Sequence, residues 1–600
     1  TAVGVWIFVP DARWAQFGQE IIASVFYVEN WALAAQSVDY MALSNAQSPV
    51  QHFWSLGVEE QFYIGWPLLV ILAFAISGAR AARPTRVLFL IIAAATALSL
   101  CYSIWSTAID PSVAYFSTFT RAWEFGAGAL LAVLMRRWPM PVGTGLFAAT
   151  ASLAGFAAIG LAMLTFSGDT PFPSYTALLP VVGTMLVVAA GTPRTVASTA
   201  PIIRWTPIQF LGNVSYGAYL WHWPIIVLLP YATGLPITTL QAVSVLALSI
   251  ILGWVSKSFI EDPLRTARVV SRSRPRQTFV GGLIAMMLVA GAALPLATFQ
   301  IAPPATADVD SQPDCYGAAA MVTSSCGDPE TIPLVASLSS FSVDLPPEDI
   351  RACERATTAG EYVRCDFGDL EGTGTQFALV GDSHATRLVE PLRSIAEAQG
   401  GSLSTFLVSG CSTMSTELTG SAWGFEPVYG EQCRSVTDDI QNAVVEDEQI
   451  DVIILTNRTR LYVTDVSEYR ALSPSMVEQT IRRIQAAGKQ VVVIADPPEM
   501  SAVPPQGGGS ASDCLTKATS PSQCSLERSA ATFDDPMRAA AIATNSMLID
   551  LDDLFCTNER CMTQIGGLVV YSDDNHLSRS YAMSMVAPLS ERLGAFVSGD

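Results

Sequence analysis

The chain has 600 residues, of which 50% are hydrophobic and only 14% are charged, and its mean hydropathy is +0.37. This length exceeds one compact core, and the composition is too apolar for an ordinary soluble enzyme, so much of the chain is expected to lie in a membrane. The 53 acidic residues outnumber the 33 basic ones and give a formal net charge of -20, which disfavours the basic surface that nucleic-acid binding requires. No nucleic-acid partner is expected.

Long apolar runs occupy the first half of the chain. A run of roughly 17 to 25 apolar residues crosses about 30 Å of hydrocarbon. Nine candidates precede residue 300, at 17–34, 59–78, 86–106, 122–135, 144–166, 174–190, 214–231, 237–258 and 278–299. The run at 122–135 is short, so its existence as a separate span stays open. The sequence therefore predicts a multi-span α-helical membrane domain.

Arginines recur in every second connection between these runs. They are Arg80, Arg83 and Arg86, then Arg136 and Arg137, then Arg194 and Arg204, and finally Arg265, Arg268, Arg272, Arg274 and Arg276. The intervening connections at 35–57 and 167–169 carry no Lys or Arg. Because cytoplasmic loops retain basic residues, this alternation predicts that residues 300–600 face the non-cytoplasmic side.

The chain begins at Thr1, without Met, at the approach to an apolar run. A signal peptide would show a positively charged segment, a short apolar core and a small-residue cleavage site, and this pattern is not found at the start. We therefore expect the sequence to be incomplete at its N-terminus.

Cysteines concentrate in the second half, because Cys101 alone precedes residue 300 and ten follow it. Residues 301–374 are polar, as in a linker or extension. Four cysteines within them would nevertheless crosslink the segment by disulfides in an oxidising compartment. The sequence predicts five short-loop disulfides, although spacing alone leaves the pairing open. No Cys-x-x-Cys occurs, so a zinc site is disfavoured and no metal is expected. The ten cysteines are Cys315, Cys326, Cys353, Cys365, Cys411, Cys433, Cys514, Cys524, Cys556 and Cys561.

From residue 375 onward, short apolar runs alternate with helical patterns such as Met476–Ala487. Continuous apolar strands separated by helices are typical of a parallel sheet covered by helices, which predicts an α/β/α domain. Such sheets carry their chemistry at the carboxyl ends of the strands. The apolar runs are Phe377–Val380, Thr405–Val408, Val452–Leu455, Val491–Ala495 and Met547–Ile549.

Two motifs fit this pattern. Gly-Asp-Ser-His at 381–384 directly follows the first apolar run, and Asp-Asp-Asn-His at 573–576 lies near the chain end. A serine hydroxyl needs a base to take its proton, and the base needs a partner that fixes its tautomer. Ser383, His576 and Asp573 supply this set. Gly-Asp-Ser alone is common in loops, but the second motif favours a catalytic triad.

These motifs resemble the SGNH hydrolase family over residues 375–600. The family's first block is Gly-Asp-Ser and its last is Asp-x-x-His. The resemblance implies an oxyanion hole made by the serine N–H, a glycine after the second strand and an asparagine after the third. Gly410 matches the glycine by order, and Asn457 is the candidate asparagine, although the family's Gly-x-Asn is not intact. The alternative is that Gly410 permits a turn beside a disulfide and Asn457 caps a helix. His384 neighbours Ser383 on a tight turn, so a structural or substrate-contacting role is expected for it.

Four polar and aromatic clusters lie within or beside the apolar runs. Charged and histidine side chains are costly in hydrocarbon and so indicate function. An interfacial aromatic belt is the alternative, and for the fourth cluster a helix-end pair of Glu261 and Arg265 is equally acceptable. The clusters are 52–63 with His52, Glu59 and Glu60, then 121–126 with Arg121 and Glu124, then 215–224 with Tyr216 and His222, and finally 259–265.

The same clusters resemble the membrane-bound acyltransferase family three over residues 1–265. Members carry acyl groups, usually acetyl from a cytoplasmic acyl-CoA, to sugars outside, and some add a further span and an SGNH domain. The resemblance implies a membrane acyltransferase domain at 1–265, a connecting segment with an extra transmembrane helix at 266–300, the disulfide-containing extension at 301–374 and an extracytoplasmic SGNH domain at 375–600. The family's first spans, with a basic residue before an essential His, are not in this sequence, and His52 and His222 do not replace them.

The resemblances together imply a multi-pass O-acyltransferase of a bacterial cytoplasmic membrane. An acyl group, expected to be acetyl, would pass from acyl-CoA through an acyl-enzyme on Ser383 to a surface polysaccharide, with no bound cofactor. Arg121, Glu124 and Glu59 are the candidates for lining the path. The alternative is a membrane-anchored carbohydrate esterase, which would use the same triad. Such an esterase would need a membrane anchor but not a multi-span membrane domain. A glycan-binding transporter or sensor would leave Ser383 idle.

Overall fold

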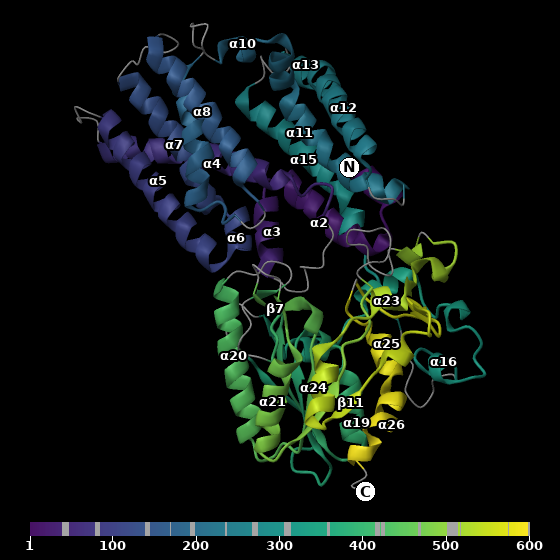
Figure 1. Ribbon diagram of the computed structural model, residues 1–600. Coiled ribbons are helices and arrows are strands. Elements are labelled where there is room, and N and C mark those ends of the chain that lie inside the picture. Colours follow the sequence, from purple (N-terminus) through teal and green to yellow (C-terminus); the bar gives the residue numbers. More distant parts are fainter. Residues whose placement is uncertain are drawn as a thin grey trace. The chain divides into compact units, whose positions relative to one another are not determined.

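The computed structural model of the chain describes all residues except 39–46, 78–83, 138–144, 168–169, 192–198, 234–236, 267–273, 305–313, 357–360, 415–419, 422–426, 466–469, 501–513, 517, 574 and 598–600. The chain forms two compact units, one made mainly by residues 13–233 and 237–299 and the other mainly by residues 300–600. The first unit is helical, and the second contains the main sheet (Figure 1).

Long helices dominate the N-terminal unit. Among the described residues, five helical segments are long and apolar enough to cross a membrane, namely Phe53–Ile76, Arg86–Ile109, Ala148–Thr165, Thr239–Thr266 and Pro275–Ala297. They fall on five of the predicted spans. The principal helices are α2 (Trp14–Val25), α3 (Glu29–Val38), α4 (Phe53–Ser77), α5 (Pro84–Ile109), α7 (Thr118–Arg137), α8 (Gly145–Thr165), α9 (Leu178–Ala190), α11 (Thr206–Thr233), α12 (Thr239–Ser256) and α15 (Pro275–Ala297).

The run predicted as a span at 17–34 differs, because it is broken into α2 and α3. Tyr27 lies between these helices with φ of 56°, a left-handed backbone conformation through which an α-helix cannot continue. The short run at 122–135 lies within α7. Of the arginines behind the predicted orientation, Arg80, Arg83, Arg194, Arg268 and Arg272 lie outside the described residues, as do residues 168–169 of one intervening connection.

The C-terminal unit is built on a seven-stranded sheet with the order β1-β4-β3-β6-β9-β11, in which β2 also pairs with β4. Every pairing is parallel except that of β2 with β4. The predicted parallel sheet is therefore present, and all five apolar runs form its strands. The strands are β1 (Glu354–Ala356), β2 (Arg364–Gly368), β3 (Gln376–Gly381), β4 (Ser402–Ser409), β6 (Val452–Thr456), β9 (Gln490–Ile494) and β11 (Met547–Ile549).

The sheet begins before residue 375, inside the segment expected to be an extension. Strands β1 and β2 both pair with β4. Neither strand is a continuous apolar run in the sequence. In β2, exposed and half-buried positions alternate, so it gives no signal of a buried strand. The segment before them is also packed, since Tyr316, Phe341 and Ile350 belong to the core of this unit.

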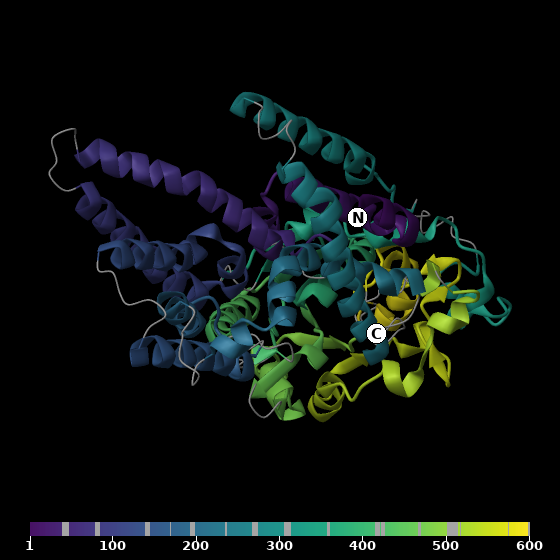
Figure 2. The ribbon, with the colours of Figure 1, turned by 90° about the horizontal axis from the view of Figure 1, so that it is seen from above.

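Helices cover both faces of the sheet. Phe377 and Leu379 of β3 belong to one core, whereas Ala378 and Val380 belong to the other, as the alternation of a strand requires. The first core is completed by α19 (Val389–Ala398), α25 (Arg579–Ser584) and α26 (Val586–Val597), and the second by α20 (Pro427–Glu446), α21 (Pro474–Ala486) and α24 (Pro536–Thr544). The green helices α20 and α21 lie on the opposite side of this unit from the yellow α25 and α26 (Figure 1; Figure 2). The expected α/β/α layering is confirmed.

Five disulfides crosslink this unit, in agreement with the predicted number. They join Cys315 to Cys326, Cys353 to Cys365, Cys411 to Cys433, Cys514 to Cys524 and Cys556 to Cys561. Cys101 is a free, exposed thiol.

Candidate active site

The nucleophile turn joins the carboxyl end of β3 to the short helix α18 (Ser383–Thr386). Asp382 caps this helix, because its side chain accepts the backbone N–H of His384 at 3.0 Å. A Cβ at Gly381 would overlap the carbonyl oxygen of Thr456 at the end of β6. Glycine is therefore needed where the turn passes the neighbouring strand.

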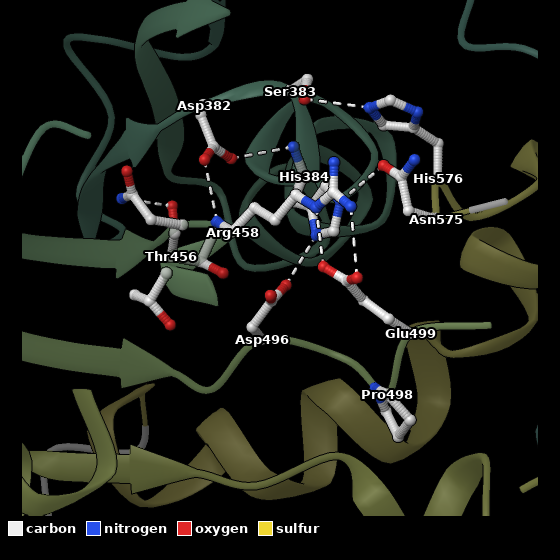
Figure 3. A network of polar contacts seen from close by, with 12 residues as sticks. Asp382, Ser383, His384, Thr456, Arg458, Asp496, Pro498, Glu499, Asn575 and His576 are labelled. Carbon is white, nitrogen blue, oxygen red and sulfur yellow. Dashed lines mark hydrogen bonds and ion pairs between the residues drawn. The ribbon is translucent and has the colours of Figure 1, made fainter. Parts of the chain in front are cut away.

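The structure brings the three predicted triad residues together, and Figure 3 shows the contact between Ser383 and His576. The Oγ of Ser383 lies 2.9 Å from Nε2 of His576, and Nδ1 of His576 lies 2.7 Å from Oδ2 of Asp573. The other oxygen of Asp573 accepts the backbone N–H groups of Asn575 and His576 at 2.9 and 2.7 Å. Ser383 is 5% exposed and His576 is 8% exposed, so the hydroxyl and the base meet with little surrounding water.

Asp573 is held in its charged form. Burial alone would raise the pKa of its carboxyl group, but His576, Arg387 and the backbone N–H of Asn575 hold that pKa well below its usual range. A charged Asp573 accepts the proton on Nδ1 of His576 and so leaves Nε2 as an acceptor facing Ser383. This arrangement has the geometry of an activated serine nucleophile.

Asp382 ties the nucleophile turn to the segment that follows β6. Its Oδ2 accepts the backbone N–H of Arg458 at 2.8 Å and the hydroxyl of Tyr462 at 2.7 Å. The guanidinium group of Arg458 in turn donates to both oxygens of Glu499, at 2.6 and 3.2 Å (Figure 3). The turn is thereby fixed by charged hydrogen bonds in a buried setting.

The two oxyanion candidates lie after β4 and β6, in the expected chain order. Gly410 has φ of 69°, a left-handed conformation that glycine adopts without strain. The side-chain nitrogen of Asn457 donates to Oγ1 of Thr413 and to the carbonyl of Thr456, at 3.1 and 2.7 Å. Binding of an oxyanion by Asn457 would require one of these bonds to open, so its role stays a prediction.

His384, for which a structural or substrate-contacting role was expected, meets two residues that the sequence did not point to. His384 points away from Ser383, and its ring contacts Asp496 at 2.6 Å and Asn575 at 3.0 Å. Asp496 comes two residues after β9, at the strand edge that such sheets use for chemistry, so its position was the available signal. Asn575 carries no such signal beyond its place next to His576.

Two more ionisable residues, the buried Arg387 and the half-buried Glu354, lie near the triad. Arg387 follows Ser383 by one helical turn, is 5% exposed and helps to lower the pKa of Asp573. Glu354 of β1 lies within electrostatic reach of His576 and Arg387, and burial raises the pKa of its carboxyl group. Glu354 lies in the segment expected to be an extension, which is why the sequence did not suggest it.

In the N-terminal unit, His52 and His222 lie together. The His52 ring is 5.6 Å from that of His222 and 5.2 Å from that of Tyr219, between centroids. Tyr219 donates its hydroxyl to the His52 carbonyl at 2.7 Å, and Nδ1 of His222 lies 2.6 Å from the Tyr219 carbonyl. The first and third sequence clusters therefore form one site. Tyr216, of the third cluster, is 55% exposed.

Arg121 and Glu124 form a second polar site in this unit. Their side chains are 3.4 Å apart, and the Arg121 guanidinium lies 4.7 Å from the ring centroid of Phe172 and 5.0 Å from that of Tyr115. Glu124 and Phe172 help to line a cavity of about 250 Å³. Glu59 accepts the hydroxyl of Tyr63 at 2.9 Å, its neighbour Glu60 is half-buried, and Glu261 pairs with Arg265 at 3.9 Å as an i,i+4 pair.

Residues 13–257 match an acyltransferase domain family, and residues 352–591 match an SGNH domain family described as fused to AT3 domains. The chain is therefore an acyltransferase-family membrane domain fused to an SGNH domain, and both resemblances drawn from the sequence are confirmed. The SGNH match begins at residue 352, in agreement with the early start of the sheet.

The chain is similar to the protein YrhL of Bacillus subtilis (strain 168), with 31% identity over 282 residues, which are 45% of this chain and 43% of that protein. It is 32% identical to the peptidoglycan O-acetyltransferase OatA of Listeria monocytogenes over 264 residues, 41% of this chain and 40% of that protein. It is 29% identical to the O-acetyltransferase OatA of Staphylococcus aureus (strain NCTC 8325 / PS 47) over 278 residues, 43% of each. The chain spans about two fifths of the length of these relatives.

Proposed function

We propose that the chain is a membrane O-acetyltransferase that acetylates peptidoglycan through an acyl-enzyme on Ser383. The 2.9 Å contact between the Ser383 hydroxyl and His576, with Asp573 behind it, carries this proposal. The acyltransferase domain in the same chain supports delivery of an acyl group to that serine. The Listeria relative is a peptidoglycan O-acetyltransferase, which supports peptidoglycan as the acceptor.

The proposed reaction has two half-reactions that use the same base. In the first, Oγ of Ser383 attacks the acyl carbonyl carbon while Nε2 of His576 takes the hydroxyl proton, and the donor's leaving group departs with that proton. In the second, a sugar hydroxyl attacks the acyl-serine carbonyl and gives its proton to Nε2. Oγ of Ser383 then leaves and takes the proton back, so that the enzyme is regenerated.

The donor in this proposal is acetyl-CoA on the cytoplasmic side. Acyl-CoA is large and charged, so it cannot cross the hydrocarbon. CoA would leave on the cytoplasmic side, a group of the N-terminal unit would carry the acyl group outward, and that group would be the one displaced when Ser383 attacks. The ion pair between buried Arg121 and half-buried Glu124, together with the cavity beside Glu124, supports a polar path in this unit. The SGNH domain then lies on the outer side of a bacterial cytoplasmic membrane, where peptidoglycan is found.

The first test uses the purified full chain in detergent with p-nitrophenyl acetate, an activated ester. Mass spectrometry is expected to find one acetyl group on the peptide that contains Ser383, and a soluble peptidoglycan fragment is then expected to receive it. Ser383→Ala should abolish both signals. Ser529→Ala, at an exposed serine of α23 (Arg528–Ala531), is the matched control and should change neither. Release of free acetate alone, with the glycan present, would instead identify an esterase.

The second test addresses the donor. The full chain is reconstituted in vesicles with labelled acetyl-CoA on one side and a soluble peptidoglycan fragment on the other. Label on the glycan, absent with Ser383→Ala, supports the proposal. Vesicles whose Ser383 accepts acetyl from the ester but never from acetyl-CoA would contradict acetyl-CoA as the donor.

A further inference from the structure

A second histidine–carboxylate pair lies beside the triad. Nδ1 of His384 is 2.6 Å from Oδ1 of Asp496, and Nε2 of His384 is 3.0 Å from Oδ1 of Asn575 (Figure 3). All three side chains are buried, with exposures of 6%, 2% and 7% respectively. The His384 and His576 rings meet edge to face, with their centroids 5.3 Å apart. We call the three side chains the Asp496–His384–Asn575 relay.

The relay and the triad join the same two backbone segments. Ser383 and His384 are consecutive, and so are Asn575 and His576. The Ser383–His576 bond and the His384–Asn575 bond therefore run side by side between the nucleophile turn and the base segment, which are far apart in sequence. One hydrogen bond between two segments permits rotation about it, whereas two bonds fix both the separation and the orientation. Burial strengthens both bonds.

We propose that the Asp496–His384–Asn575 relay positions His576 against Ser383, with His384 as an imidazolium that donates one N–H to Asp496 and the other to Asn575. This inference rests on the proposed function, in which His576 is the base. His384, Asp496 and Asn575 act here as positioning residues. They hold the segment that carries the base rather than exchange protons with the substrate.

Electrostatics support the charged form of His384. Burial lowers the pKa of its imidazole, but the Asp496 carboxylate outweighs this effect and raises the pKa to about 9. A neutral ring with its proton on Nδ1 would need the amide nitrogen of Asn575 to turn toward Nε2, whereas a neutral ring with its proton on Nε2 would set the lone pair of Nδ1 against the Asp496 carboxylate. Four charged groups face the relay, and the ring of His576 also contacts it. The four are Asp382 from the nucleophile turn, Arg458 after β6, Glu499 after β9 and Asp535 at the start of α24.

Two variants of Asn575 separate these arrangements. Asn575→Asp keeps an oxygen acceptor for an imidazolium, whereas Asn575→Leu removes the acceptor and keeps a similar volume. Loss of positioning is expected to slow acetylation of Ser383 by p-nitrophenyl acetate about 100-fold in Asn575→Leu, through kcat and with KM unchanged. Asn575→Asp should retain most of the rate. Asn558→Leu, at an exposed asparagine, is the matched control and should match the wild type.

Asp496→Asn tests the charge of His384. The amide still fills the site, but it no longer holds the proton on the imidazole. The wild-type rate is expected to fall as the pH rises through about 9. In Asp496→Asn this fall should move to the ordinary histidine value of about 6.5 or below, because the carboxylate no longer offsets the lowering of the pKa by burial. A role limited to packing would leave the pH of this fall unchanged.

Hydrogen exchange of the peptide around residues 572–577, measured on the same full-chain samples, gives a readout that needs no activity. Exchange should be faster in Asn575→Leu and unchanged in Asn575→Asp. Three results would each overturn the relay. The first is a wild-type acetylation rate and wild-type exchange in Asn575→Leu. The second is a rate in Asp496→Asn that falls at the same pH as in the wild type, and the third is an equal loss of rate in the two Asn575 variants. If the wild type fails to acetylate Ser383, the proposed function is wrong, and the exchange comparison still decides whether the relay holds the segment.

Discussion

Replacement of Asp573 by asparagine tests how the carboxylate sets the tautomer of His576. One oxygen of Asp573 accepts two backbone N–H groups, and the other accepts the proton on Nδ1 of His576. Asparagine has only one acceptor oxygen, which the two backbone donors will hold. Its NH₂ group then faces Nδ1 and donates to it, so the ring proton moves to Nε2. That proton points at Ser383, and the ring no longer accepts the hydroxyl proton.

The expected loss is large because the contacts remain but the proton is misplaced. Acetylation of Ser383 in Asp573→Asn should be about 10⁴-fold slower, equivalent to about 5.5 kcal/mol of barrier. Stopped-flow measurement of p-nitrophenolate release from the full chain gives this rate. Asp553→Asn is the control, because Asp553 is exposed and pairs with Arg592 at 2.6 Å. A loss of less than about tenfold in Asp573→Asn would refute the reasoning, since His576 would then act without a fixed tautomer.

Three further predictions concern the same unit, and hydrogen exchange of the β6 amides in the full chain measures each of them. Gly381→Ala forces the turn away from Thr456, so it should lower the free energy of unfolding by about 1–3 kcal/mol and also slow acetylation. If Gly381→Ala exchanges at the wild-type rate, the added methyl group does not overlap the Thr456 carbonyl oxygen. Arg458→Met leaves the buried Glu499 unpaired and should cost about 3–5 kcal/mol, while Glu499→Leu in the same chain should recover most of it. If the double variant is no more stable than Arg458→Met, the loss is not due to the unpaired charge. The lowered pKa of Asp573 contributes stability that is present above about pH 3.9 and is lost as the pH falls further. After correction for the intrinsic pH dependence of exchange, acid should therefore lower the protection of the β6 amides less in Asp573→Asn than in the wild type, and an equal loss of protection would argue against this linkage.

The parts that the sequence predicted well are those with a local signal. Strands such as β6 are continuous apolar runs because both of their faces are buried, so the run is visible in the amino-acid sequence itself. The triad was predicted because Ser383 and His576 each lie in a short motif at a recognisable place. Their meeting then follows from the rule that parallel strands end at one edge of the sheet.

The parts that the sequence did not reveal depend on distant contacts or on backbone geometry. His384 meets Asp496 and Asn575 across 112 and 191 residues, and no local pattern relates these positions. The break at Tyr27 is a backbone conformation inside an apolar stretch, so the hydropathy of the sequence does not reveal it. Strand β2 gains its place by pairing with β4 at the edge of the sheet rather than by burial, and edge pairing has no apolar signature.

In each of the five disulfides, the two cysteines are neighbours in the order of cysteines along the chain, separated by 5 to 22 residues. A polypeptide that emerges from a translocation pore in N-to-C order presents each cysteine's partner next. An oxidant that simply joins thiols in order of appearance then produces the native connectivity, with no reshuffling by an isomerase. Pairing in order of synthesis is therefore sufficient to give this connectivity.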